Sequence, residues 1–156
     1  MEIIDVHVHF GAPKTTDCEG NVLCYWSQGF EDQIAYYAML AITGSLFKKV
    51  SYELVKDHIF SVINKSIKTD KFVLLALDQV YDDKGQAQPD QTHLHTSNDL
   101  IIKLKNEYVE KFNDNRILFG CSIHPNRKDK KQELERCIKA GAVLCKWIPS
   151  SMQINP

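Results

Sequence analysis

The sequence predicts an α/β fold built on a parallel β-sheet, and two observations carry that prediction. Segments with the pattern of strands alternate with segments of helical periodicity, which is typical of parallel βαβ units. One strand-like segment, at residues 71–77, is an uninterrupted apolar run, as expected of a strand that is covered on both faces. The length of 156 residues suits one ordinary domain, so we expect a single domain over residues 1–156.

The first half of the chain is expected to hold two strands. Residues 2–9 have the composition of a first strand, and residues 10–28 contain the glycines and proline of a long loop. Apolar residues at helical spacing predict helices at 31–42 and 51–67. The apolar run at 71–77 is the second strand.

The second half continues the alternation. Residues 78–96 are polar and predict a loop, after which Ser97 is expected to cap a helix that ends near residue 112. Residues 116–122 predict the third strand, Asp129 is expected to cap the next helix, and residues 142–148 predict the fourth strand. Four such strands amount to half of a (β/α)₈ TIM barrel, which needs about 250 residues, so we expect a partial barrel.

Charge and composition exclude several classes of protein. The formal net charge is −1 without a basic cluster, which argues against a nucleic-acid or anionic-membrane partner. No apolar run approaches the ~20 residues of a membrane span, and a strand that begins at residue 2 or 3 leaves no room for a signal peptide. The five cysteines form no CxxC pair, so free thiols and a cytoplasmic location are expected.

The first strand carries an unusual set of polar side chains. Alternate residues of a strand share a face, so Asp5, His7 and His9 are expected on one face, with Ile4, Val6, Val8 and Phe10 on the other. Polar groups on a covered strand are costly without partners. Two neutral imidazoles can bind Zn²⁺, and a carboxylate can hold the second ring nitrogen of one of them. The alternative is a partly exposed edge strand with surface histidines.

These residues also carry a family resemblance. IDVHVHF resembles the IDxHxH start of the amidohydrolase-related family (amidohydrolase family 2), which comprises metal-dependent hydrolases with a distorted TIM-barrel fold. LLALDQVYDDKG is similar to the second strand of that family and the loop after it. The segment from RILFGCSIHP to AVLCKWIP is similar to its third strand, third helix and fourth strand. Residues 13–70 match only loosely.

The resemblance implies a site with one or two divalent metals, usually Zn²⁺, at the carboxyl end of the barrel. There a metal-activated water attacks a small carbonyl-containing substrate, and some relatives run decarboxylations instead. His7 and His9 match the first ligand pair of the family. Its remaining ligands lie on the fifth, sixth and eighth strands, so the match covers the N-terminal half only. A non-catalytic half-barrel, completed by a C-terminal half or by a second copy in a homo-oligomer, is therefore the alternative to an active hydrolase.

Three further residues lie at expected strand ends. Lys146 is at the position of the fourth-strand lysine that is carbamylated in two-metal members of the wider superfamily. It is a candidate metal ligand, a contact for a substrate carboxylate, or the partner of a structural acid. His124 and Asp78 end the third and second strands and are candidates for contact with the substrate or the ligands. For His124 the alternative is a loop histidine bonded to backbone, and for Asp78 a cap of the following loop.

A second HxH pattern occurs at His93 and His95. It follows a polar stretch and precedes the expected helix cap at Ser97. Without a buried strand around it, this pattern indicates a solvated loop rather than a metal site. The sequence also places Cys121 and Cys145 at buried strand positions.

Overall fold

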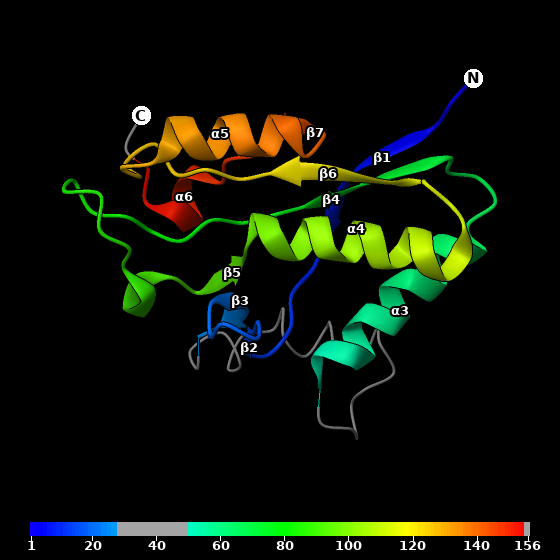
Figure 1. The fold of residues 1–156 in the computed structure, drawn as a ribbon, viewed down its shortest axis with the longest axis horizontal. Coiled ribbons are helices and arrows are strands. Elements are labelled where there is room, and N and C mark those ends of the chain that lie inside the picture. The colour runs from blue at the N-terminus through cyan, green and yellow to red at the C-terminus, as the bar shows by residue number, and fades with distance from the viewer. Residues whose placement is uncertain (28–49, 155–156) are drawn as a thin grey trace.

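A parallel sheet of four strands organises the chain. The computed structural model describes residues 1–27 and 50–154 (Figure 1). The strands are β1 (Ile4–His9), β4 (Lys71–Leu75), β6 (Ile117–Cys121) and β7 (Ala142–Cys145), in the spatial order β1-β4-β6-β7. All three neighbouring pairs are parallel, which confirms the predicted α/β class. The helix expected at residues 31–42 lies outside the described residues.

The helices that connect the strands begin and end close to the predicted positions. They are α3 (Tyr52–Lys65), α4 (Asn98–Phe112) and α5 (Lys130–Lys139). The short helix α6 (Pro149–Met152), which follows the last strand, was not predicted. Ser51 and Ser97 cap α3 and α4, because their hydroxyls accept hydrogen bonds from backbone N–H groups of the first turn. Asp129 occupies the N-cap position of α5, as predicted, but its side chain makes no capping hydrogen bond and instead binds Arg127 at 2.8 Å.

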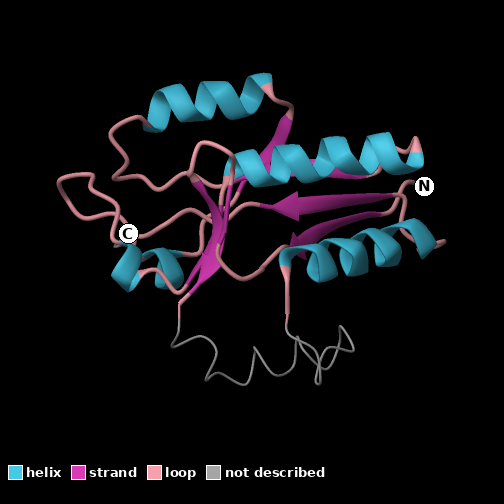
Figure 2. Ribbon diagram, turned by 60° about the horizontal axis from the view of Figure 1, so that its bottom comes forward, coloured by secondary structure: helices cyan, strands magenta, loops and turns pink. Residues whose placement is uncertain are grey.

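The long helices cover one face of the sheet and run along its strands (Figure 2). The buried cluster on that face joins alternate residues of β4 and β6 to apolar residues of α3, α4 and α5: Phe72, Leu74, Ile117, Phe119, Cys121, Phe60, Ile63, Leu100, Ile101, Leu104, Tyr108 and Cys137. Leu134, Cys137 and Ile138 recur at helical spacing, which predicts an apolar stripe on α5. Cys137 is buried, whereas Leu134 and Ile138 are 41% and 60% exposed, so the prediction is wrong for these two residues.

The opposite face of the sheet is close-packed where its strands meet. Val73 and Leu75 of β4 are buried there. A Cβ atom added at Gly120 of β6 would lie 2.6 Å from Leu75 Cδ2, 3.0 Å from Val73 Cγ1 and 3.2 Å from Leu144 Cδ1. A side chain at this point between β4 and β7 would therefore force Leu75 and its neighbours to shift.

A small antiparallel sheet corrects the prediction of two long loops. Within residues 10–28 lie β2 (Thr15–Thr16) and β3 (Val22–Trp26), and within residues 78–96 lie the 3₁₀ turn Pro89–Gln91 and β5 (Leu94–Thr96). They form the sheet β2-β3-β5. These strands have two to five residues, which is too short for a clear periodicity, and β3 and β5 are paired across about 70 positions of sequence.

The two outer strands of the parallel sheet are its least covered parts. Ile4 and Val6 of β1 are 44% and 55% exposed, and Val143 of β7 is 53% exposed. β1 is thus the partly exposed edge strand that was the alternative for the first strand, because among the described residues it has a sheet neighbour only on the β4 side. No helix in the described ranges has the length and apolar character to cross a membrane.

Candidate functional site

The two histidines of the first strand lie together at its carboxyl end. Nε2 of His7 and Nε2 of His9 are 3.0 Å apart, and both residues are exposed. The register of β1 against β4 shifts between Asp5 and Val8. The Asp5 carboxylate accepts a hydrogen bond of 2.9 Å from the backbone N–H of His7 at this irregularity. Asp5 therefore binds the backbone N–H of His7. The sequence suggested that its carboxylate binds an imidazole nitrogen instead.

Lys146 reaches the same point from the other edge of the sheet. Its Nζ lies 3.1 Å from Nε2 of His7 and 2.9 Å from Nε2 of His9. Lys146 follows β7, whereas the histidines belong to β1. Three strand spacings of about 4.8 Å would hold these strands about 14 Å apart in a flat sheet. The sheet must therefore curve, so that side chains of β1 and side chains at the end of β7 converge on the same side of the sheet.

The chemistry of these three nitrogens fits a divalent cation. A neutral imidazole carries one lone pair, on Nε2 or Nδ1 according to its tautomer. Two Nε2 lone pairs that face each other at 3.0 Å repel unless a proton or a cation lies between them. A tetrahedral zinc with Zn–N distances of 2.0–2.1 Å would set its nitrogen ligands about 3.3 Å apart, close to the observed spacings. The described part of the chain holds no group of three or more His, Cys, Asp or Glu side chains suited to a metal. The two imidazoles can bind a cation as neutral groups, whereas the Lys146 ammonium must first lose a proton before its nitrogen can do so.

Desolvation lowers the pKa values of two members of this cluster. Partial covering of the His9 ring lowers its pKa to about 4, with further lowering by the neighbouring charges of Lys146 and His7. Desolvation also lowers the pKa of the Lys146 ammonium below its ordinary value. His9 is consequently neutral at physiological pH, which is the state that a metal ligand requires.

A cavity of about 290 Å³ lies beside the histidines. Asp5, His7 and His9 line it from β1, and His58 lines it from α3 together with apolar side chains of that helix and Phe72. Its size is at the lower end of small-molecule sites. No motif in the sequence points to His58, which lies within the helix predicted at residues 51–67.

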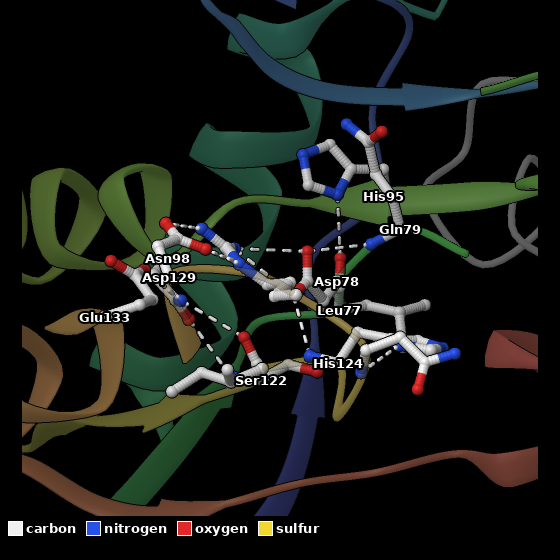
Figure 3. Close-up of polar contacts among 12 residues, drawn as sticks. Leu77, Asp78, Gln79, His95, Asn98, Ser122, His124, Asp129 and Glu133 are labelled. Atoms are coloured by element: carbon white, nitrogen blue, oxygen red, sulfur yellow. Dashed lines mark hydrogen bonds and ion pairs between the residues drawn. The ribbon is translucent and has the colours of Figure 1, made fainter. Parts of the chain in front are cut away.

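Asp78 and His124 belong to a different polar cluster, at the ends of β4 and β6 (Figure 3). Asp78 Oδ2 accepts hydrogen bonds from the backbone N–H of His124 at 2.8 Å and from Arg127 at 3.2 Å. Its Oδ1 accepts one from the N–H of Gln79 at 2.9 Å. The Asp78 carboxylate thus connects the loop after β4 to the loop after β6. This resembles the alternative for Asp78, a cap of the following loop.

His124 is fully buried, and backbone groups occupy both of its ring nitrogens. Nδ1 accepts a hydrogen bond from the N–H of Asn126 at 3.1 Å, so Nε2 carries the proton and donates to the carbonyl of Met152 at 2.8 Å. This is the geometry of the alternative reading, a loop histidine bonded to backbone. The structure does not bring His124 or Asp78 together with His7 and His9 in one cluster.

The same polar cluster contains residues that sequence reasoning missed. Asn98, at the start of α4, donates to the carbonyl of Ser122 at 3.1 Å and accepts from its N–H at 3.0 Å. It also donates to Glu133 at 2.7 Å, and Glu133 binds Arg136 at 2.7 Å. Asn98 thereby fixes the segment after β6 against two helices. A polar residue just after a helix cap was the only signal for it.

His95 is also misplaced by the prediction of a solvated loop. It is 5% exposed and pairs with Tyr25 across the small sheet, and its Nδ1 donates to the carbonyl of Leu77 at 2.9 Å. Burial lowers its pKa below the ordinary value. His93 is exposed, as expected, and lies 3.1 Å from the Ser27 hydroxyl. The second HxH pattern therefore spans the start of a strand of the small sheet: His95 is a buried residue of β5, and His93 is exposed directly before that strand.

Comparisons with known proteins add no family. Neither the family models, nor the curated proteins, nor the solved structures include a match to this chain. The candidate site consequently stands on its geometry: two imidazoles and one amine that converge at the carboxyl edge of a parallel sheet, beside a small cavity.

Proposed function

We propose that the chain carries metal-dependent hydrolase chemistry of the amidohydrolase type, on a scaffold that is part of a (β/α)₈ barrel. The observation that supports this most strongly is the convergence of His7, His9 and Lys146, with spacings of 2.9–3.1 Å between their nitrogens. Active sites of α/β proteins collect at the carboxyl ends of parallel strands. The sheet order β1-β4-β6-β7, in chain order, is that of the first half of such a barrel.

In this proposal His7 and His9 hold a divalent metal, most simply Zn²⁺, through their Nε2 atoms. When bound, such an ion supplies Lewis-acid polarisation of a carbonyl and a nucleophilic water at neutral pH. Asp5 fixes the backbone of His7, so the ligand pair is preorganised before any ligand arrives. The cavity beside the pair is suited to a small substrate.

Lys146 has one of two roles in the proposed site. In the first role, Lys146 is a third nitrogen ligand of the metal. In the second, the metal occupies the two imidazoles, and the Lys146 amine is free to bind a negatively charged group of the substrate. In both roles the amine must keep its place over the histidines. The backbone provides this, because the Lys146 N–H donates to the Cys121 carbonyl at 2.8 Å and its own carbonyl accepts from the Ser122 hydroxyl at 2.9 Å.

The test is turnover by the zinc-loaded chain on a panel of small amides, lactones and N-acyl amino acids, with carbon dioxide release followed in parallel to detect decarboxylation. We expect turnover that a chelator abolishes and that the double variant His7→Ala/His9→Ala lacks. His93→Ala, which removes an exposed histidine outside the site, serves as the matched control and retains it. Turnover that survives chelation or the double variant would contradict the proposal. Zinc binding without any turnover would favour the non-catalytic half-barrel.

A further inference from the structure

Three thiols gather where the last two strands of the sheet meet. Cys121 of β6 and Cys145 of β7 are paired residues in the ladder between these strands. The neighbouring thiols of Cys137, on α5, and Cys145 raise the pKa of the Cys121 thiol, so the three sulfur atoms interact. All three cysteines are free. Neighbouring strands lie about 4.8 Å apart, so the Cα separation of Cys121 and Cys145 falls in the range of 4.4–6.8 Å that disulfides adopt.

Only one of the three thiols belongs to an exposed residue. Cys145 is exposed, whereas Cys121 and Cys137 are 1% and 0% exposed. Cys145 borders a surface cavity of about 280 Å³ that Leu134 and Trp147 also line. A small oxidant therefore reaches Cys145 first and finds a second thiol directly behind it. This arrangement of an accessible and a resolving cysteine is the one found in redox-sensing sites.

We propose that Cys145 and Cys121 form a peroxide-sensitive pair whose disulfide displaces Lys146 from the two histidines, a regulation that rests on the proposed metal site. The Cys145 sulfur attacks one oxygen of hydrogen peroxide, the O–O bond breaks, and water leaves with the thiol proton to give a sulfenic acid. The Cys121 sulfur then attacks the Cys145 sulfur, the S–O bond breaks, and a second water leaves with the Cys121 proton. The two thiols lose two electrons and two protons, and one peroxide is reduced to two waters.

The link to the site is the backbone next to the pair. A disulfide brings its Cβ atoms to about 3.8 Å, which is closer than the strand spacing, so β6 and β7 must shift at this position. Lys146 follows Cys145 in the chain, and its N–H donates to the Cys121 carbonyl. The shift therefore moves Lys146, whose Nζ is within hydrogen-bond distance of Nε2 of His7 and of His9. A disulfide strained in this way is also readily reduced, which makes the change reversible.

Peptide mapping tests the thiol chemistry without any reference to metal. The reduced full chain is treated with hydrogen peroxide, remaining thiols are alkylated, and the tryptic digest is analysed by mass spectrometry. We expect residues 117–127 (ILFGCSIHPNR) cross-linked to residues 140–146 (AGAVLCK), with the mass reduced by two hydrogens. Cys145→Ser, at an exposed position, removes this species, and Cys18→Ser, the matched exposed control, leaves it. Oxidation of Cys145 to sulfinic acid without a cross-link, or a cross-link only to Cys18 or to residues 137–139 (CIK), would overturn the pairing.

Zinc affinity of the same samples tests the regulation. We expect oxidation to weaken zinc binding about 10- to 100-fold, the range for loss of a residue that orients metal ligands, and dithiothreitol to restore it. In Cys145→Ser, peroxide leaves the affinity unchanged. An oxidised chain that binds zinc as tightly as the reduced one would overturn the regulation while the proposed function stands. Failure of the reduced chain to bind zinc would overturn the proposed function and the regulation together, and the cross-link result would still decide the thiol chemistry.

Discussion

Nζ of Lys146 lies 2.9 Å from Nε2 of His9, although 137 positions of sequence separate the two residues. The contact joins the carboxyl ends of β1 and β7, the two edges of the parallel sheet. It places an amine and two imidazoles in one cluster, with no acid among the three groups. The candidate metal site thus depends on the curvature of the sheet as much as on the HxH motif.

Replacement of Lys146 tests the contribution of this amine. Lys146→Met keeps most of the side-chain volume and removes the nitrogen, so we expect zinc binding to weaken about 10- to 100-fold, with a change in stability within about 0.5 kcal/mol. Lys131→Met on the exposed side of α5 is the control and is expected to change neither. The measurements are zinc titration calorimetry and urea unfolding. Equal zinc affinities of the two variants would mean that Lys146 is not a metal ligand and instead contacts the substrate or stabilises the fold.

Gly120 tests the close packing of the sheet face that bears Val73 and Leu75. A methyl group at this position would lie 2.6 Å from Leu75 Cδ2, so Gly120→Ala is expected to lower the free energy of unfolding by about 1–3 kcal/mol. At Gly11 an added Cβ meets only Leu94 Cδ1, at an ordinary 3.5 Å. Gly11→Ala is therefore expected to be tolerated. Equal urea midpoints for the two variants would contradict the packing described for β4, β6 and β7.

Glu133 makes stability depend on pH. Burial alone would raise the pKa of this carboxyl group, but hydrogen bonds from Arg136 and Asn98 to its charged form lower the pKa below its ordinary value of 4.5. A group whose pKa is lower in the folded state stabilises the fold above its unfolded pKa, and that contribution is lost as the pH falls through the folded value. Glu133→Gln is expected to cost about 1–2 kcal/mol at pH 7.

The difference between wild type and Glu133→Gln should then shrink as the pH falls from 4.5, as followed by urea unfolding across the acid range. Glu135→Gln, at an exposed position of the same helix, provides the control and should track the wild type throughout. A cost of Glu133→Gln that stays constant with pH would mean that the charge of Glu133 contributes nothing.

The edges of the parallel sheet are expected to promote self-association. Exposed apolar side chains on β1 and β7, such as Val6 and Val143, offer surfaces for strand pairing. Val6→Lys should reduce the association seen by sedimentation velocity, because a lysine on an edge disfavours pairing. Val109→Lys on α4 makes the same chemical change away from both edges and should leave association as it is. A wild-type chain that sediments as a sharp monomer would contradict this expectation.

The sequence was sufficient for the main sheet because long periodic segments determine it. The apolar run at 71–77 and the capped helix after Ser97 both agree with the structure. The small sheet was not predictable, since β3 and β5 are short and their pairing depends on contacts between distant segments. The same reason hid the burial of His95, whose partner is the carbonyl of Leu77.

The candidate site was only partly predictable. The spacing of His7 and His9 is visible in the sequence, and alternation places Lys146 on a defined face of its strand. Their convergence depends on the curvature of the sheet, which no local pattern records. Likewise, His124 is at a strand end, as expected of a site residue, yet its two ring nitrogens are taken by backbone groups.

Zinc content of the purified chain after dialysis against trace metal shows whether His7 and His9 bind a metal. We expect the wild type and His93→Ala to retain a stoichiometric amount of zinc, and His7→Ala/His9→Ala to retain none while it unfolds at the same urea concentration as the wild type. Equal zinc contents in the wild type and the double variant would contradict the assignment of His7 and His9 as the metal ligands.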